Sequence, residues 1–233
     1  MSVMKYTFAA ELQYKSHTDS AQLDGFDVDL TQAPPKQWLP SNVAMHKLDA
    51  FSPLPHDLVG KYDIVHLRLF VVLIKHNNPV PLLRNLIGML KPNGYIQWDE
   101  HDHVSQKVVT ADPAINPKTV QAVLDFVRPI DDMMGPRTWV SALGDIFAAQ
   151  GLLRPRLYRF ALPPELYRYD TDNVLSVYEE VSRKILDRRD KRDGEELRKL
   201  ISVAYVDSQQ GVAICHDKVV VVGQKPKEHH RGT

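Results

Sequence analysis

One continuous stretch, residues 61–100, constrains the fold of this chain more than any other part of the sequence. Residues 62–67 (YDIVHL) are apolar and rich in β-branched side chains, which is typical of a strand buried on both faces of a parallel sheet. Apolar residues then recur at the spacing of an α-helix, at Leu82, Leu83, Leu86, Ile87 and Leu90. The stretch therefore begins as a strand followed by an amphipathic helix.

Four residues, Lys91 to Gly94, mark the end of this helix. Pro92 cannot continue a helix, and Gly94 suits the left-handed conformation that commonly ends one. Residues 95–98 are then predicted to form a second strand. Two parallel strands joined by one helix make a right-handed crossover unit, and α/β proteins bind ligands beyond the carboxyl ends of such strands.

The composition limits the classes of partner. With 29 basic and 29 acidic side chains, the chain carries no net charge that would attract nucleic acid or an anionic membrane surface. No apolar run approaches the length of a membrane span, and the first residues lack the apolar core of a signal peptide. The one cysteine, Cys215, has apolar neighbours that favour a buried packing role. We therefore expect a soluble, cytoplasmic protein that binds a small molecule.

Acidic residues follow two further predicted strands. Residues 21–30 are predicted as a strand whose last part carries Asp27 and Asp29. A carboxylate at such a strand end is placed to accept hydrogen bonds from both hydroxyls of a ribose, or it caps the next turn. Residues 43–48 form a short extended stretch that ends at Asp49, where a carboxylate is placed to bind an adenine amino group.

An ordered series of segments carries a resemblance to a known family. The segments are Gly25-Phe26-Asp27, residues 38–42 (WLPSN), Asp49, residues 62–68, residues 90–100 (LKPNGYIQWDE) and residues 219–226 (VVVVGQKP). Together they resemble the successive motifs of class I S-adenosylmethionine-dependent methyltransferases, in the version found in fungal secondary-metabolite clusters. The resemblance implies a Rossmann-like α/β fold, with a mostly parallel sheet flanked by helices, as a single domain over residues 1–226. It also implies helical cap elements at about residues 112–138 and 170–210, before a disordered tail at residues 227–233.

The resemblance further implies a cofactor, S-adenosylmethionine, and roles for individual residues. Asp27 matches the residue that holds the ribose, and Asp49 matches the one beside the adenine amino group. Ala50, with Phe51, matches the flank of the base, while His66 and Arg68 lie at the strand end beneath the methionine portion. The implied activity is methyl transfer to a small acceptor molecule, at oxygen on a polyketide-type scaffold.

One family motif has no counterpart in the sequence. The family's first strand leads into a glycine-rich turn, whereas no glycine precedes Gly25 here. That strand would lie between the strands of residues 21–30 and 62–67, so its loss would leave unpaired backbone groups in the sheet. Three explanations remain open: a shortened gene model of a complete enzyme, a substitute strand at residues 2–8, or a chain that has lost methyl transfer. The third includes a cyclase-type enzyme, such as a pericyclase, and an inactive partner subunit.

Two histidines just beyond the second strand are the candidate catalytic residues. His101 and His103 would lie at the rim of the ligand site, where an imidazole of near-neutral pKa is suited to remove a proton from a phenol or enol. A solvated rim is the alternative. Metal ligation is disfavoured, because neighbouring residues of an extended segment point in alternate directions and no second cluster completes a site. The sequence therefore predicts no metal ligands.

The remaining chain is predicted to supply helices and the last strand. Helices are predicted around residues 117–127, 139–147, 174–185 and 197–204, and strands at residues 156–162 and 219–222. The charged run at residues 187–196 is expected to be a solvated turn. By resemblance, Tyr167, Tyr169 and Tyr178 are candidates to line the acceptor pocket. The sequence leaves the oligomeric state open, with a homodimer as one option.

Overall fold

A computed structural model describes residues 21–134 and 137–227 of the chain. The predicted substitute strand at residues 2–8 and all but Lys227 of the predicted disordered tail lie outside the described residues. The strands are β1 (Leu23–Asp27), β2 (Val43–Lys47), β3 (Tyr62–Arg68), β4 (Leu90–His101), β5 (Lys107–Thr110), β6 (Leu153–Phe160), β7 (Val212–Cys215) and β8 (Lys218–Gln224). The α-helices are α1 (Val80–Met89), α2 (Lys118–Met134), α3 (Leu143–Ala149), α4 (Tyr167–Val181), α5 (Asp187–Arg189) and α6 (Lys191–Ser208), with a π-helical turn at Ser182–Leu186.

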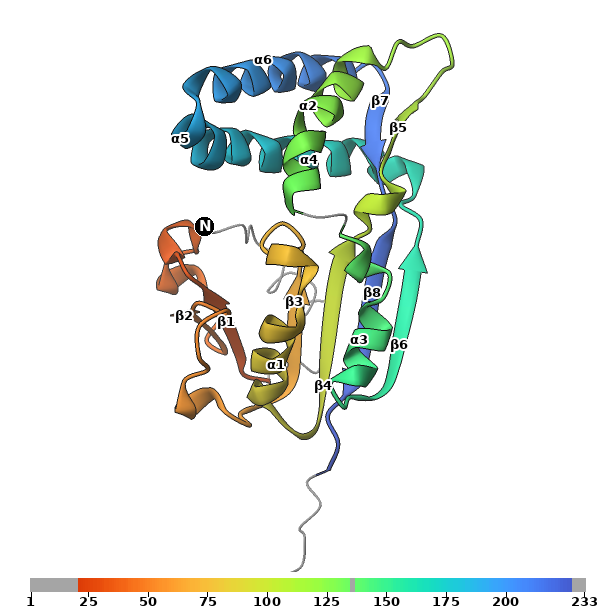
Figure 1. Ribbon diagram of the computed structural model, residues 1–233. Coiled ribbons are helices and arrows are strands. Elements are labelled where there is room, and N and C mark those ends of the chain that lie inside the picture. The colour runs from red at the N-terminus through yellow and green to blue at the C-terminus, as the bar shows by residue number, and fades with distance from the viewer. Residues whose placement is uncertain (1–20, 135–136, 228–233) are drawn as a thin grey trace, which may run out of the picture.

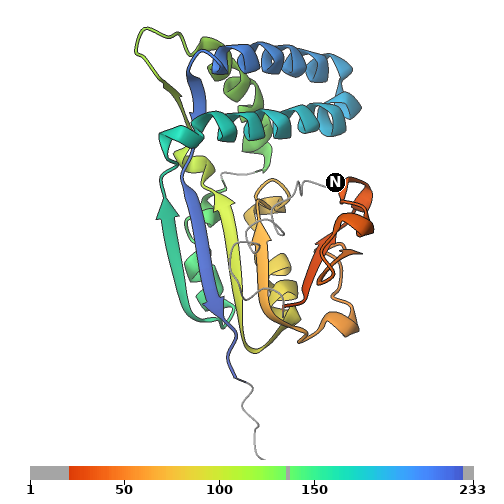
Figure 2. The same ribbon diagram turned by 180° about the vertical axis from the view of Figure 1, so that it is seen from behind.

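The main sheet has the strand order β3-β4-β8-β6. Strands β3 and β4 are parallel, and β8 runs antiparallel between β4 and β6, so three of its four strands share one direction. Helices α1 and α3 lie on one face of this sheet, as Figure 1 shows, and Figure 2 gives the view onto the opposite face. The predicted α/β class and the predicted closing strand are both confirmed.

Trp98 of β4 lies at the centre of the core beneath α1 and α3. Its side chain is fully buried, and its ring centroid lies 5.6 Å from that of Trp139 and 6.5 Å from that of Phe147. The covered face of the sheet also includes the buried residues Val65, Leu67, Ile96, Val219 and Val221. Along β3 and β4 these residues alternate with mostly polar ones, whereas Val220 and Val222 take the alternate positions of β8. The prediction that residues 62–67 form a strand buried on both faces is wrong, because Ile64 is 66% exposed and only one face of β3 is covered.

The predicted crossover unit is confirmed as β3, α1 and β4, but its turn is built differently. We expected Gly94 to take the left-handed conformation, whereas Asn93 takes it, with φ of 64°. Asparagine tolerates this region because its short side chain can hydrogen-bond locally. Gly94 is needed for another reason: a Cβ atom there would lie 3.0 Å from the carbonyl oxygens of Asp63 and Lys91.

The strands β1 and β2 pair in parallel as a separate sheet, which is not hydrogen-bonded to β3 through a ladder in the described part of the chain. Side chains make the connection instead. The hydroxyl of Tyr62 at the start of β3 donates to Asp24 Oδ2 at 2.9 Å, and the ring of Phe26 packs edge-on against Tyr62 at 6.0 Å. The division lies where the resemblance places the strand that has no counterpart.

Two sequence predictions are wrong in detail. The charged run at residues 187–196 was expected as a solvated turn, but it forms α5 and the start of α6. Asp190 caps α6 by accepting a hydrogen bond from the Arg192 amide, and Arg198 pairs with Asp187 at 3.0 Å, so these charges stabilise helix ends. The strand predicted at residues 21–30 is only Leu23–Asp27, because Asp29 caps a following 3-10 turn.

Helices α2, α4 and α6 pack around a second buried cluster beyond the carboxyl ends of β3 and β4 (Figure 1). We call these three helices the cap. The short antiparallel strand pair β5–β7 connects the cap to the main sheet, and the sequence did not predict this pair. Buried Thr171 of α4 accepts a hydrogen bond from the Ile214 amide of β7 at 2.9 Å. Over the described ranges, no helix has both the length and the apolar character needed to cross a bilayer.

Replacing Tyr62 by phenylalanine tests the connection between the two sheets. Asp24 keeps its contacts with His46 and Lys61, so the variant should fold with a free energy of unfolding lowered by about 1 kcal/mol. Urea denaturation measures this quantity. The control is Tyr95→Phe in β4, an exposed tyrosine, whose stability should stay within about 0.5 kcal/mol. Equal effects of the two changes would show that the Tyr62–Asp24 bond does not hold the sheets together.

Candidate functional site

The carboxyl ends of β3 and β4 are joined by a buried carboxylate. Oε1 of Glu100 accepts hydrogen bonds from the Phe70 amide at 2.6 Å and from Trp98 Nε1 at 2.8 Å. Oε2 has no hydrogen-bond partner among the described residues. Burial raises the pKa of Glu100 to about 7, although the bonds from Trp98 and Phe70 act to lower it. This side chain fixes the loop after β3 against the end of β4.

The face of the sheet opposite α1 carries three of the polar residues singled out in the sequence. His66 and Arg68 of β3 share this face with Asp99 and His101 of β4, since their register partners are Gln97 and Asp99. His66 Nε2 lies 3.2 Å from Asp99 Oδ2. The fold therefore brings His66 and Arg68, expected near the cofactor, to the same strip of sheet as the candidate catalytic residue His101.

Beyond this strip, His101 meets two residues from distant parts of the chain. Asp170 lies in the first turn of α4, and His216 lies in the connection between β7 and β8. Asp170 Oδ1 is 3.5 Å from His101 Nε2, Asp170 Oδ2 is 2.8 Å from His216 Nδ1, and the two imidazole centroids are 4.3 Å apart. We call His101, Asp170 and His216 the junction cluster, because it lies where the sheet meets the cap.

Backbone pairing explains why these three side chains converge. His101 is paired with Lys218 in the antiparallel ladder of β4 and β8, so His216 lies just beyond the last paired residue. The Asp102 amide donates to the Asp217 carbonyl at 2.9 Å and extends this pairing. The bond between Thr171 and Ile214 then holds the start of α4 beside β7.

His103 lies next to the junction cluster in a 3-10 turn. Its Nδ1 is 3.0 Å from a guanidinium nitrogen of Arg137, and its ring meets that of His216 edge-on at 5.8 Å. The Arg137 amide donates to Asn77 Oδ1 at 3.0 Å, which ties the segment after α2 to the loop after β3. His103 is thus held between the cap and the sheet and does not lie on an open rim.

Burial determines the protonation of these histidines. It lowers the pKa of His101 to about 3, and the neighbouring His216 lowers it further. Burial and the charge of Arg137 likewise hold the pKa of His103 well below its usual value. The expectation of imidazoles with near-neutral pKa is therefore wrong, because the sequence could not show that the cap buries them. Both rings are neutral near pH 7 and are weak bases.

The two acids expected beside a nucleoside lie at the ends of β1 and β2. Asp27 Oδ1 accepts the Asp29 amide at 2.9 Å, while Asp49 accepts the Phe51 amide at 3.0 Å and the Ser52 hydroxyl at 2.9 Å. Asp27 therefore shapes the following turn, which is the alternative raised for it from the sequence, and Asp49 likewise shapes the turn that follows it. A carboxylate oxygen can accept more than one hydrogen bond.

The carboxyl ends of β2 and β3 lie at the same edge of the protein. Phe51 follows β2 and Phe70 follows β3, and their ring centroids are 6.3 Å apart. Ala50 packs against the main core. The carboxylates there fit the ribose hydroxyls and the adenine amino group of S-adenosylmethionine, which are hydrogen-bond donors. The glycine-rich turn expected around the methionine end has no counterpart in the sequence, so the fit extends to the nucleoside half.

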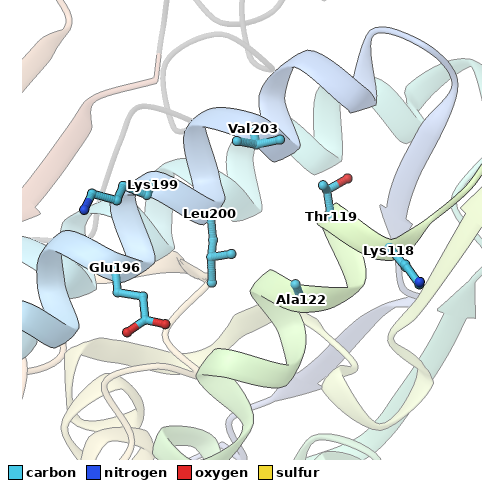
Figure 3. A pocket seen from close by; sticks show the side chains of 7 residues that line it. All are labelled: Lys118, Thr119, Ala122, Glu196, Lys199, Leu200 and Val203. Carbon is cyan, nitrogen blue, oxygen red and sulfur yellow. The ribbon is translucent and has the colours of Figure 1, made fainter.

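A hollow of about 270 Å³ lies on the cap between α2 and α6. Figure 3 shows its lining by Lys118, Thr119 and Ala122 of α2 and by Glu196, Lys199, Leu200 and Val203 of α6. It belongs to the helical layer and not to the strand ends. The tyrosines proposed from the sequence do not share one surface, since Tyr178 is buried in the cap core and Tyr169 is 65% exposed.

Comparison with known proteins finds local likeness to fungal methyltransferases. No family model matches the sequence. Methyltransferase grgD of a Penicillium species is 37% identical over 81 residues, which make up 35% of this chain and 28% of that protein. N-methyltransferase tcpN of Claviceps purpurea is 29% identical over 82 residues, 35% of this chain and 29% of that protein. The matched segments thus span less than a third of either curated relative.

Among solved structures, the YcgJ protein of Bacillus subtilis aligns with a TM-score of 0.46. The two chains are 17% identical, and the alignment covers 88% of this chain and 83% of that one.

Sequence reasoning missed Asp170 and His216 as site residues. The argument against a metal was that no second cluster completes a site, yet the folded chain places both residues beside His101. No spacing in the sequence could have revealed this, because the three residues come from separate elements. A polar residue immediately before an apolar last strand, as at His216, is the one local signal.

Raising the pH should destabilise the protein through Glu100. Because burial raises its pKa from 4.5 to about 7, the native state binds this proton more tightly than the unfolded chain. The protonated Glu100 carboxyl stabilises the folded protein fully below pH 4.5. This stabilisation is lost as the pH rises through about 7, which lowers the free energy of unfolding by on the order of 3 kcal/mol. Urea denaturation at several pH values, in the presence of a chelator, measures the slope of the free energy of unfolding against pH.

Glu100→Gln should flatten that slope, because glutamine accepts the same hydrogen bonds without a charge. The exposed Glu165→Gln is the matched control and should keep the slope of the parent protein. A parent-like slope in Glu100→Gln would contradict the assignment.

Proposed function

We propose that the protein transfers a methyl group from S-adenosylmethionine to a small molecule. One geometric observation carries the proposal: the acid-bearing ends of β1 and β2 adjoin the ends of the crossover unit β3-α1-β4, as the Phe51–Phe70 contact indicates. Ligands of α/β proteins bind at this edge. The local likeness to methyltransferase grgD supports the same activity.

Each residue has a stated role in this proposal. Asp27 accepts the ribose hydroxyls, Asp49 accepts the adenine amino group, and Ala50 packs beside the base. When bound, S-adenosylmethionine supplies a methyl group on a sulfonium cation, which reacts without a metal once an acceptor atom is held in line. The chain then contributes mainly proximity and orientation.

The buried histidines narrow the class of acceptor. Neutral His101 and His103, with depressed pKa values, are suited to accept or donate hydrogen bonds but not to remove a proton from a weakly acidic group. We therefore propose an acceptor that ionises readily by itself, such as an enolic or phenolic hydroxyl on a polyketide-type scaffold. Oxygen is the acceptor atom in this proposal, and an amine is the competing one.

Binding of S-adenosylmethionine to the full chain is the first test. Isothermal titration calorimetry should detect binding, and Asp27→Ala should weaken it by roughly 10- to 100-fold, the loss of about 1.5–3 kcal/mol for a hydrogen bond to a charged group. Asp29→Ala, two residues away, removes only the cap of a 3-10 turn and should bind like the parent. Well-folded protein that fails to bind would refute methyl transfer for this chain.

The pH dependence of methyl transfer is the second test. The rate should follow ionisation of the acceptor, so two acceptors of different acidity should give inflections at different pH values. The Glu100→Gln variant should give the same inflections, which excludes an effect of Glu100. An inflection near pH 6.5 shared by both acceptors would instead show that a histidine acts as the base.

A second candidate is a methyltransferase-like protein without methyl transfer. The observation that favours it is that, within residues 21–134 and 137–227, no backbone ladder joins β1–β2 to the main sheet at the edge where the cofactor would bind. Such a chain would use the ligand site for a rearrangement or cyclisation, or would act as a partner subunit. Release of S-adenosylhomocysteine with a labelled product would exclude this candidate.

A further inference from the structure

The junction cluster has the composition of a metal site. Its possible ligand atoms, one each from His101, Asp170 and His216, all lie within 4.8 Å of one another. They come from the end of β4, the first turn of α4 and the β7–β8 connection. A metal at this point would join the sheet to the cap.

Several polar atoms of the cluster are buried without a hydrogen bond. The His216 side chain has no exposed surface, and the Asp170 side chain is 5% exposed. His216 Nδ1 and Asp170 Oδ2 contact each other at 2.8 Å. Within the described chain, neither atom has a further hydrogen-bond partner, and His216 Nε2 has none. Buried polar groups are normally satisfied, so unpaired atoms that converge on one point indicate a missing partner.

We propose that His101, Asp170 and His216 bind a divalent transition-metal ion such as Zn²⁺. Two imidazole nitrogens and one carboxylate oxygen are ligands that zinc prefers, at about 2.0–2.2 Å from the metal. Tetrahedral coordination at that distance separates ligand atoms by about 3.3 Å. His216 Nδ1 lies 2.8 Å from Asp170 Oδ2 and His101 Nε2 lies 3.5 Å from Asp170 Oδ1, and one ligand atom from each of the three residues lies within 4.8 Å of the other two.

Three protein ligands leave one coordination position open, as in catalytic zinc sites. His101, with a side chain 12% exposed, lies on the strip of sheet shared with Arg68. The positive charges of Arg68 and Lys218 interact electrostatically with His101. They would therefore favour an anionic fourth ligand, such as a hydroxide or an ionised hydroxyl of an acceptor. The metal site does not depend on methyl transfer and is tested without it.

The experiment uses the full chain with His229→Ala and His230→Ala, so that the tail supplies no imidazole. This parent is stripped with a chelator and titrated with Co²⁺, whose visible absorption reports coordination geometry, and then with Zn²⁺ in competition. One ion per chain and a four-coordinate spectrum are expected. His216→Ala and Asp170→Asn should each weaken binding by at least about 100-fold, since even outer ligand partners are worth about 10- to 100-fold.

His56→Ala is the matched control, because His56 is exposed on a 3-10 turn far from the cluster in sequence. It should bind Co²⁺ like the parent. Zn²⁺ should also raise the Tm of the parent and of this control, because a ligand that binds only the folded state stabilises it. That shift should be lost in His216→Ala and Asp170→Asn.

X-ray absorption at the zinc edge keeps the proposal testable if a variant fails to fold. The parent should show nitrogen and oxygen ligands with two imidazoles. A sulfur ligand, fewer than two imidazoles, or parent-like affinity in either folded variant would overturn the proposal, as would absence of binding by the parent.

Discussion

The pairing of β4 along both edges is the constraint on which the rest of the structure depends. Its parallel ladder with β3 places Glu100 against the loop after β3, and its antiparallel ladder with β8 places His101 beside the start of that strand. The covered face of β4 contributes the fully buried Trp98 to the main core. The opposite face presents the polar strip, so one strand supplies both the core and the candidate site.

Burial by the cap changes the chemistry of the site. Had His101 and His103 been exposed at a rim, their imidazoles would titrate near neutral pH and would suit proton removal. The cap desolvates both rings, so they are neutral and poorly basic. A change in solvent exposure thus moves these residues from acid–base chemistry toward hydrogen bonding.

The division between the two sheets connects the sequence to the function. Tyr62 donates a side-chain hydrogen bond to Asp24, and Lys61 pairs with the same carboxylate, whereas no backbone ladder joins β1 to β3 among the residues that the structure describes. The edge that would hold a nucleoside is therefore assembled from two separately paired sheets.

The sequence by itself determined the crossover unit, the α/β class, the closing strand and the buried Cys215. These follow from local patterns: the period of strand and helix, the turn at residues 91–94, and apolar runs long enough to be buried. The left-handed conformation in that turn was assigned to the wrong residue, because asparagine and glycine both tolerate this conformation. Only the packing of Gly94 against Asp63 decides between the two residues.

Only the tertiary structure decided the junction cluster, the neutral histidines and the division of the sheet. His101, Asp170 and His216 meet because β8 runs antiparallel beside β4 and because Thr171 fastens α4 to β7. Neither contact leaves a periodic signal in the sequence, since each joins segments far apart along the chain. Local patterns fix the elements, whereas burial and convergence depend on how those elements pack.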